Sequence, residues 1–503
     1  MAHEMFSERL RAAMAEKGLK QADLIHAAAE RGEKLGKSQV SQYVSGKVVP
    51  RANVVRLLAS VLVVDEGWLA AGEGARAAAR PETANAPVRP TATTRSITMR
   101  EFKKSSKLDN VLYDVRGPVA DEAARMEDEG LRILKLNIGN PAPFGFRTPD
   151  EVVHDMRQQL PDCEGYSDSR GLFSARKAIM QYAQLKHLPN VSMDGIYTGN
   201  GVSELIQLCM NALLDTGDEI LIPSPDYPLW TACATLAGGT PVHYLCDEQA
   251  EWNPDLADIE SKVTSSTKAI VIINPNNPTG AVYPREVLEQ IVEIARRHQL
   301  MIFSDEIYDR LCMDGHEHVS IASLAPDLPC VTFSGLSKSH MIAGYRIGWM
   351  ILSGNKRSMR DFIYGINMLS NMRLCSNVPA QSIVQTALGG YQSVERYVEP
   401  GGRIYEQRNY VYEALNAIDG ITAVKPKAAF YIFPKIDVKK FNITDDEQFA
   451  LDLLHEKRIL ITRGGGFNWP EPDHFRIVYL PRMEVLHEAM DDLADFFAHY
   501  RQG

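Results

Sequence analysis

Short β-branched runs alternate with helical stretches over most of the chain, and this alternation limits the fold more than any other feature. The clearest runs are Glu219–Ile222, Ala269–Ile273, Leu300–Phe303 and Val331–Phe333. Between the second and third, residues 284–298 carry apolar side chains at helical spacing. Strands that alternate with helices predict an α/β fold with a mostly parallel sheet. After about residue 390, a helix and then Ala429–Phe433 predict a smaller α+β domain.

The first part of the chain has a different pattern. Residues 5–71 form several short amphipathic stretches, the first with Phe6, Leu10 and Met14 on one face. They predict a separate all-α domain over residues 1–73.

Composition sets the remaining boundaries. Residues 74–103 are rich in Ala, Pro, Thr and Arg, which predicts a flexible linker. Residues 104–503 follow as one α/β region. We expect its large domain at about 150–390 and its small domain to combine 104–149 with 391–503.

Bulk properties narrow the class of protein. The 503 residues contain no apolar run long enough to span a bilayer, and the polar N-terminus lacks the apolar core of a signal peptide. We therefore expect a cytoplasmic protein with no membrane contact. The seven cysteines form no C-x-x-C pair, which favours free thiols over disulfides or a metal site.

Charge is unevenly distributed. Residues 1–80 hold 12 Lys+Arg and 9 Asp+Glu, a net charge of +3. Because the whole chain has a net charge of −10, residues 81–503 carry −13. A basic domain on an acidic body is typical of a nucleic-acid-binding module attached to an enzyme.

Glycine-rich and amide-bearing motifs follow the predicted strands, where ligands bind in open α/β sheets. Gly199–Glu204 precedes a helical stretch, and the free N–H groups at such a helix start suit a phosphate. Asn277, within Ile273–Gly280, can donate a hydrogen bond to a ligand oxygen, and Pro278 beside it suits a cis peptide. An ordinary turn is the alternative for both segments.

A carboxylate and a lysine follow the next two strands. Asp305 is costly to desolvate there unless a cation, such as a protonated pyridine nitrogen, pairs with it; a helix N-cap is the alternative. Lys338 follows Val331–Phe333, and a lysine withdrawn from water can attack a carbonyl group. A single lysine is otherwise a solvated surface charge.

The contents and order of these motifs resemble the fold-type I, class I/II aminotransferases. Gly335-Leu-Ser-Lys338 followed by Gly344-x-Arg346-Ile-Gly348 matches the lysine signature of that family, although Met341 stands where a smaller residue is usual. From about Lys104 to the C-terminus the chain is similar to the bacterial alanine (glutamate–pyruvate) aminotransferases. The segments that carry this similarity are 135–146, 224–230, 391–392, 467–470 and 474–478.

The resemblance implies pyridoxal 5′-phosphate as cofactor, bound to Lys338 as a Schiff base. Asp305 would pair with the pyridine nitrogen and keep the ring an electron sink. Asn277 and Tyr308 would hydrogen-bond the phenolic oxygen, and Tyr227 would stack on the ring.

The remaining implied contacts hold the phosphate. Backbone N–H groups of Gly201, Val202 and Ser203 would bind it, with side-chain contacts from Ser337 and Arg346.

Further implied contacts concern the substrate and a second subunit. Arg476 would take the substrate α-carboxylate as a bidentate pair, beside Gly139 and Asn277. Tyr166 resembles the tyrosine that reaches the phosphate across a dimer interface, so the resemblance implies a homodimer. Arg373 is a candidate for the distal carboxylate of glutamate, with a structural salt bridge as the alternative.

The implied reaction is ping-pong transamination between an amino acid and a 2-keto acid, with L-alanine and 2-oxoglutarate giving pyruvate and L-glutamate.

The N-terminal domain resembles the helix-turn-helix module of phage-repressor-like (Xre-type) DNA-binding proteins. Leu19–Leu24 matches the first helix of the motif, and Ser38–Tyr43, with Gly46 and Pro50, matches the recognition helix and its exit. Ser38 is the expected N-cap. The turn over Arg31–Lys37 is longer than in the tightest examples.

The resemblance implies contacts with DNA. Gln39, Ser41 and Gln42 would read base edges, and Lys37 and Lys47 would touch phosphates. A helical interaction module without a DNA target is the alternative.

Two functions therefore compete: an aminotransferase with a DNA-binding domain, and a transcription regulator that uses an aminotransferase fold as a sensor. The presence of Lys338, Asp305, Tyr227 and Arg476 favours the enzyme.

Overall fold

The computed structural model describes residues 2–29, 33, 35–72, 102–109, 111, 113 and 117–503. The chain divides into two compact units, Met1–Glu101 and Phe102–Gly503, called here the N-terminal and C-terminal units. The predicted linker, 74–103, lies outside the described residues except for its last two. The predicted turn at 31–37 lies partly outside them.

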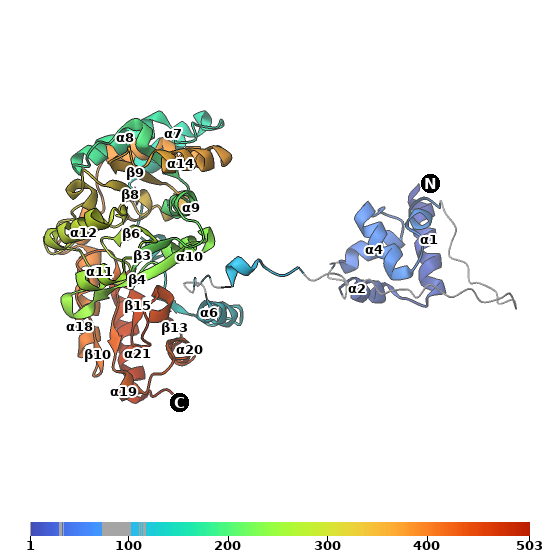
Figure 1. The fold of residues 1–503 in the computed structure, drawn as a ribbon. Coiled ribbons are helices and arrows are strands. Elements are labelled where there is room, and N and C mark those ends of the chain that lie inside the picture. The colour runs from blue at the N-terminus through green and yellow to red at the C-terminus, as the bar shows by residue number, and fades with distance from the viewer. Residues whose placement is uncertain are drawn as a thin grey trace, which may run out of the picture. The chain divides into compact units, whose positions relative to one another are not determined.

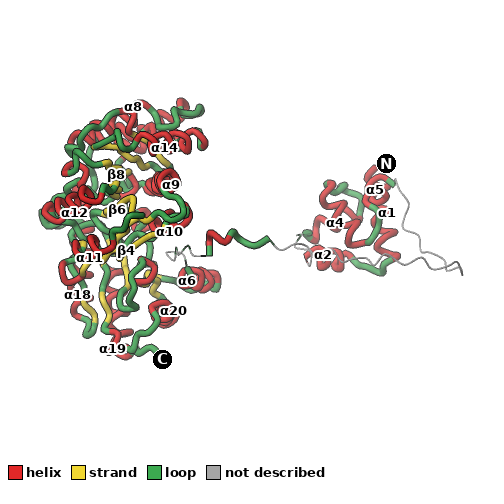
Figure 2. The backbone as a smooth tube through the Cα atoms, in the orientation of Figure 1, coloured by secondary structure: helices red, strands yellow, loops and turns green. Residues whose placement is uncertain are grey.

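The N-terminal unit is built from helices (Figures 1 and 2). They are α1 (Ala2–Glu16), α2 (Gln21–Ala29), α3 (Lys37–Val44), α4 (Ala52–Leu62) and α5 (Glu66–Ala71). The predicted apolar face is confirmed, because Phe6, Leu10 and Met14 are all buried. They pack with Leu58 and Leu69 in one apolar core.

The start of α3 corrects one prediction. Gly36, and not Ser38, is the N-cap, and the backbone N–H of Gly36 donates to Oε1 of Gln39 at 3.0 Å. Because the Gln39 side chain can satisfy this N–H from inside the first turn, the helix begins two residues before the expected position.

An eight-stranded sheet forms the centre of the C-terminal unit. Its order is β2 (Ile196–Gly199), β9 (Gly348–Gly354), β8 (Pro329–Gly335), β7 (Met301–Asp305), β6 (Thr267–Ile273), β3 (Glu219–Ser224), β4 (Thr240–Asp247) and β5 (Asn253–Pro254). Neighbours from β8 through β4 are parallel, and antiparallel pairs lie toward the two edges. The predicted α/β fold with a mostly parallel sheet is confirmed.

Both faces of this sheet are buried. Along β6, Ala269, Val271 and Ile273 pack on one side, and Ile270 and Ile272 pack on the other. A parallel strand covered on both faces reads as a continuous apolar run, which is why the sequence pattern identified it.

Helices cover these two faces (Figure 1). Those whose buried residues join the Val271 side are α9 (Val202–Leu213), α10 (Leu229–Ala237) and α14 (Arg360–Met372). Those on the Ile270 side include α7 (Asp150–Gln159), α8 (Phe173–Leu185), α11 (Leu256–Lys262), α12 (Arg285–His298), α15 (Val378–Ser382) and α16 (Val384–Gly389).

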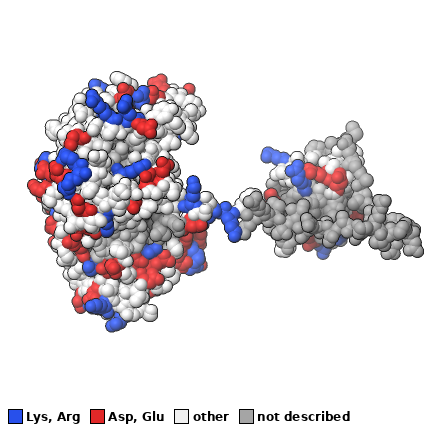
Figure 3. Space-filling view, in the orientation of Figure 1, with Lys and Arg blue, Asp and Glu red and all other residues white. Residues whose placement is uncertain are grey.

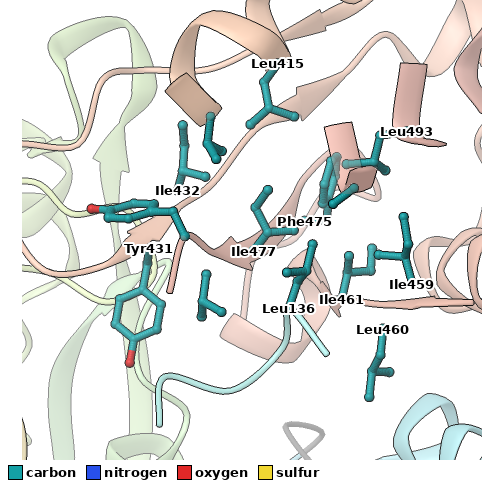
Figure 4. Close-up of a cluster of buried hydrophobic side chains, with 14 of the residues drawn as sticks. Leu136, Leu415, Tyr431, Ile432, Ile459, Leu460, Ile461, Phe475, Ile477 and Leu493 are labelled. Carbon is teal, nitrogen blue, oxygen red and sulfur yellow. The ribbon is translucent and has the colours of Figure 1, made fainter. Parts of the chain in front are cut away.

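Segments from both ends of the C-terminal unit make a second core. Its helices are α6 (Pro118–Asp128), α17 (Glu395–Val398), α18 (Arg403–Ala417), α19 (Val438–Phe441), α20 (Asp446–Lys457) and α21 (Met483–His499). Its short strands are β1 (Leu134–Lys135), β10 (Ile421–Thr422), β11 (Tyr431–Ile432), β12 (Lys435–Ile436), β13 (Ile459–Leu460), β14 (Thr462–Arg463) and β15 (Phe475–Val478). Leu134 pairs with Ile459, and Leu136, Phe475 and Ile477 pack together in this core (Figure 4).

The C-terminal unit has a surface of mixed charge (Figure 3), and the cysteines of the chain are unpaired. Lys and Arg alternate with Asp and Glu over the visible face of the C-terminal unit (Figure 3). All seven cysteines are free thiols. Within the described ranges, no helix is long and apolar enough to cross a bilayer, and no group of side chains is arranged to hold a metal ion.

Candidate active site

A cavity of about 500 Å³ lies at the carboxyl ends of the central parallel strands. This position follows from the topology, because side chains placed just after parallel strands meet at one edge of the sheet. Its lining includes these predicted site residues: Gly139, Val202, Ser203, Tyr227, Asn277, Asp305, Tyr308, Ser337, Lys338, Arg346 and Arg476.

The amine of Lys338 faces this cavity from α13 (Leu336–Ser339), which directly follows β8. Its Nζ donates to the carbonyl oxygen of Gly139 at 2.8 Å. The same atom lies 5.5 Å from the ring centre of Phe430 and 6.0 Å from that of Tyr308. Within the described ranges no carboxylate pairs with Lys338, so the amine can reach a carbonyl group in the cavity.

Asp305 is a buried carboxylate at the end of β7. Its Oδ2 accepts from Nε1 of Trp230 at 3.3 Å, and its Oδ1 accepts from the backbone N–H of Ile307 at 3.3 Å. Burial raises the pKa of Asp305 to about 6, because no cation of the described chain pairs with it. A protonated ring nitrogen would supply the missing positive charge.

The N-terminus of α9 forms another part of the lining. Gly201 is its N-cap with φ 83°, and a Cβ at this position would collide with the guanidinium of Arg346. That guanidinium donates to the carbonyl oxygens of Ala343 at 2.9 Å and Asn200 at 3.1 Å. Free N–H groups at a helix start beside an arginine suit a phosphate.

Arg476 brings a buried guanidinium into the cavity from β15. One amino group donates to Oδ1 of Asn277 at 2.9 Å, and the other donates to the carbonyl oxygen of Asn137. Its Nε has no hydrogen-bond partner among the residues that the structure describes, and burial lowers the pKa of the guanidinium. In the described part of the chain no carboxylate compensates this charge, so a carboxylate ligand would fit here.

Residues 132–493 match the family "Aminotransferase class I and II". A glutamate-pyruvate aminotransferase from Haemophilus influenzae is 59% identical over 404 residues, which are 80% of this chain and 100% of that protein. An alanine aminotransferase from Mycobacterium tuberculosis is 56% identical, covering 80% of this chain and 94% of its own length. A crystal structure of an Escherichia coli aminotransferase superimposes with a TM-score of 0.80 at 57% identity, covering 80% of this chain and 100% of that one.

This chain belongs to the class I and II aminotransferases.

The aminotransferase uses pyridoxal 5′-phosphate, and the cavity fits this group. Asp305 offers a buried negative charge to a protonated ring nitrogen, and Lys338 offers an amine to an aldehyde. The start of α9, with Arg346, offers donors to a phosphate. These three requirements are met within one cavity.

Sequence reasoning missed two tyrosines of the aminotransferase. The hydroxyl of Tyr431 lies 2.9 Å from that of Tyr308, and the hydroxyl of Tyr113 lies 3.0 Å from that of Tyr227. Tyr431 stands in an apolar run that indicated only a strand. Tyr113 stands in a segment without periodicity, so no pattern marked either residue.

Gly139 and Tyr431 are in close contact. A Cβ at Gly139 would collide with the Tyr431 hydroxyl and with the ring of Phe430. Glycine therefore lets the backbone approach the cavity, and its carbonyl oxygen accepts from Lys338.

Arg373 has a structural environment in the aminotransferase. Its Nη1 lies 2.6 Å from Oε2 of Glu204, and its Nη2 donates to the carbonyl oxygens of Thr198 at 2.7 Å and Ser169 at 3.2 Å. It does not line the cavity. Of the two roles expected for Arg373, this geometry favours the structural salt bridge.

Tyr166 lies outside the cavity lining of its own chain, with 82% of its surface exposed. The predicted DNA contacts Lys37, Gln39, Ser41 and Gln42 are all exposed on α3.

Proposed function

We propose that the enzyme transfers the amino group of L-alanine to 2-oxoglutarate, giving pyruvate and L-glutamate. The observation that carries this proposal is the buried guanidinium of Arg476, which pairs with no carboxylate among the described residues and faces the same cavity as Lys338. The names of the relatives at 56–59% identity support the choice of substrates.

In this proposal each residue of the cavity has a separate role in binding or proton transfer. Arg476 binds the substrate α-carboxylate, and Asn277 fixes the guanidinium through its Oδ1. Nζ of Lys338 accepts the proton from the substrate Cα, and the carbonyl oxygen of Gly139 holds the ammonium that results. Asp305 keeps a proton at the ring nitrogen. Pyridoxal phosphate, when bound, supplies the electron sink for the broken Cα–H bond.

Initial rates test the substrate pair. Purified full-length enzyme with L-alanine and varied 2-oxoglutarate is expected to give parallel double-reciprocal lines, the pattern of a ping-pong mechanism. L-Aspartate in place of L-alanine serves as the comparison donor. A higher kcat/KM with L-aspartate would overturn the proposed donor, and intersecting lines would overturn the mechanism.

We also propose that the enzyme is a homodimer with Tyr166 reaching the cofactor phosphate of the partner. Exposed apolar side chains support this: Tyr364, Met368 and Met372 follow one another at helical spacing along α14. The Tyr166 loop adjoins the end of that helix, where Oγ of Ser169 donates to the Asn371 side chain at 2.7 Å. A patch of this kind marks a protein contact.

Mixing two inactive variants tests a shared site. Chains with Lys338→Ala and chains with Tyr166→Ala are refolded together, so that mixed dimers contain one complete site. Recovery of activity above both parents is expected. Monomeric enzyme in sedimentation, or no recovery from mixed chains, would contradict the dimer.

A second proposed function is DNA binding by the N-terminal unit. It is supported by α3, which buries Val40 and Tyr43 while Gln39, Ser41 and Gln42 are exposed on the opposite side. A polar helix face of this kind suits a DNA groove.

Gel shifts at stated salt with genomic fragments, starting from the promoter of the enzyme itself, test this function. Gln42→Ala should weaken specific binding by roughly tenfold, since one good base contact is worth about 1–3 kcal/mol. Equal retention of all fragments by wild type and variant would contradict sequence-specific binding. If L-alanine or pyridoxal phosphate changed the affinity, the sensor function would be supported.

A further inference from the structure

Asp226 is a second buried carboxyl group near the active site, and the proposed mechanism does not use it. Its side chain is fully buried and directly precedes Tyr227, yet it does not line the cavity. Burial raises its pKa to about 7, against the lowering effect of the hydrogen bonds that it accepts. Within the described ranges no cation pairs with it.

Both oxygens of this carboxyl group accept hydrogen bonds. Nδ2 of Asn468 donates to Oδ1 at 2.6 Å, and Oγ1 of Thr231 donates to Oδ2 at 3.0 Å. The Thr231 hydroxyl lies 2.9 Å from Nε2 of His243, which fixes its orientation from the other side. Burying an apolar side chain here would cost less free energy than burying a carboxyl group. We therefore look for the role of Asp226 in the contacts that its carboxyl group makes.

These contacts join two segments that are 242 positions apart in the chain. The backbone N–H of Asp226 donates to the carbonyl oxygen of Phe467 at 3.0 Å, and Oγ of Ser224 donates to that of Asn468 at 2.8 Å. Together with the Asn468 side chain, they form a three-bond clamp between residues 224–226 and residues 467–468.

Phe467, which is part of the clamp, contacts Arg476, the proposed substrate-binding residue of the cavity. The guanidinium of Arg476 lies 4.5 Å from the ring centre of Phe467 and 4.5 Å from that of Tyr431. Among the described residues, Arg476 has no carboxylate partner and its Nε has no hydrogen-bond acceptor, so aromatic rings and two oxygen acceptors determine where its charge points. A shift of Phe467 would remove one of the two aromatic rings that hold the Arg476 guanidinium in place.

We infer that Asp226 is a positioning residue for substrate binding: it locks the Phe467–Asn468 segment and thereby fixes the Arg476 guanidinium for the carboxylate of the substrate. This inference rests on the proposed role of Arg476. It assigns Asp226 no contact with substrate or cofactor.

Kinetics of two Asp226 variants test the inference. Asp226→Ala removes both side-chain bonds, and the KM values for L-alanine and 2-oxoglutarate are expected to rise roughly tenfold, while kcat changes less than about threefold. Asp226→Asn keeps an acceptor for Asn468 and a donor for Thr231, so its KM values should stay near those of wild type. Equal KM values in Asp226→Ala and wild type would overturn the inference.

Binding of glutarate gives a readout that does not depend on turnover. This dicarboxylate has the carboxylates of 2-oxoglutarate but no keto group to react. Calorimetry with the holoenzyme should show weaker binding in Asp226→Ala and unchanged binding in Asp226→Asn. If wild type used another donor than L-alanine, the proposed substrate would fail, yet the glutarate comparison would still decide the role of Asp226.

Two further variants separate positioning from stability. Asn468→Ala removes the side-chain bond of the clamp from its other side, and the double variant with Asp226→Ala should raise KM no further than either single variant. Asp314→Ala removes the carboxylate partner of buried Arg408, which donates to Asp314 at 2.7 and 3.0 Å and makes none of the three clamp bonds. It is expected to lower stability without changing KM. Additive KM effects, or a KM rise in Asp314→Ala equal to that in Asp226→Ala, would overturn the inference.

Discussion

The N-terminal and C-terminal units use polar side chains in opposite ways. The N-terminal unit fills its core with aliphatic and aromatic side chains, and within its described residues Ser7 is the buried polar side chain. The C-terminal unit buries ionisable groups, among them Asp226, Asp305 and Arg476.

Burying an ionisable group without a partner costs free energy. A fold can retain such a group where a ligand supplies the missing charge, which is the role proposed here for a cofactor at Asp305 and a substrate at Arg476. Polar residues of α3 are exposed instead, which suits recognition of another surface. Substitutions in the two units should therefore have different consequences, and the following variants measure how different.

Lys338→Ala is expected to have the largest effect. Without the amine, no group of the described lining can accept the Cα proton from the same position, so kcat should fall by roughly 10⁴-fold or more. The absorbance of the bound cofactor should also change. Lys439→Ala, an exposed lysine on α19, is the control and should be fully active. A fully active Lys338→Ala enzyme would contradict the catalytic role of Lys338, and with it the contrast drawn between the two units.

Arg476→Lys is expected to have the next largest effect. Lysine keeps the charge but loses the planar fork, so kcat/KM for L-alanine should fall by roughly 100-fold. Arg408→Lys is a matched control, because Arg408 is also buried but already has a carboxylate partner in Asp314. That control should lose stability and keep its KM. An unchanged KM in Arg476→Lys would mean that the substrate carboxylate binds elsewhere.

The stability of Asp226→Asn relative to wild type should depend on pH. The pKa of Asp226 rises from 3.8 to about 7 on folding, so wild type loses stability as pH rises through this window. Asparagine does not titrate, and its advantage should grow by up to about 4 kcal/mol between pH 4 and pH 7 and then level off. Urea denaturation at pH 4, 5, 6, 7 and 8 measures this difference in stability. A difference independent of pH would show that the carboxyl group titrates normally.

Arg373→Ala should affect stability more than substrate choice. Loss of the Glu204 salt bridge and of two bonds to backbone oxygens should lower the free energy of unfolding by about 1–3 kcal/mol. KM values for glutamate and alanine should change alike. A selective rise in the glutamate KM would instead identify Arg373 as the partner of the distal carboxylate.

Removing the N-terminal unit should have the smallest effect on catalysis. A chain that begins at Phe102 keeps the whole C-terminal unit, and the Haemophilus influenzae relative is matched over its full length by 404 residues of this protein. Its kcat/KM should stay within about twofold of that of the full chain, as expected for an independent domain. A large loss would show that the two units are coupled.

The sequence predicted the parts of the fold that depend on local patterns. The apolar runs at 269–273 and 300–303 became β6 and most of β7, because buried parallel strands need apolar residues on both faces. Lys338 and Asp305 were recognised because each follows such a run.

Contacts between distant segments could not be predicted in this way. Asp226 contacts Asn468 across 242 positions of the chain, and Tyr308 contacts Tyr431 across 123. Neither pairing produces a periodic pattern or a motif that could be recognised in the sequence. The start of α3 was missed for a local reason. The helix was expected to begin with Ser38 as N-cap, but the Gln39 side chain accepts a hydrogen bond from the backbone N–H of Gly36, which is the N-cap instead.

The bond from Oγ1 of Thr462 to the carbonyl oxygen of Asn137 spans 325 positions, and β1 pairs with β13 in the same region. On a ribosome that adds roughly 5–20 residues per second, Asn137 waits about 15–65 s for this partner. The N-terminal unit has emerged by then with all the segments of its own core. A newly made chain therefore carries a folded N-terminal unit well before it carries a complete catalytic cavity.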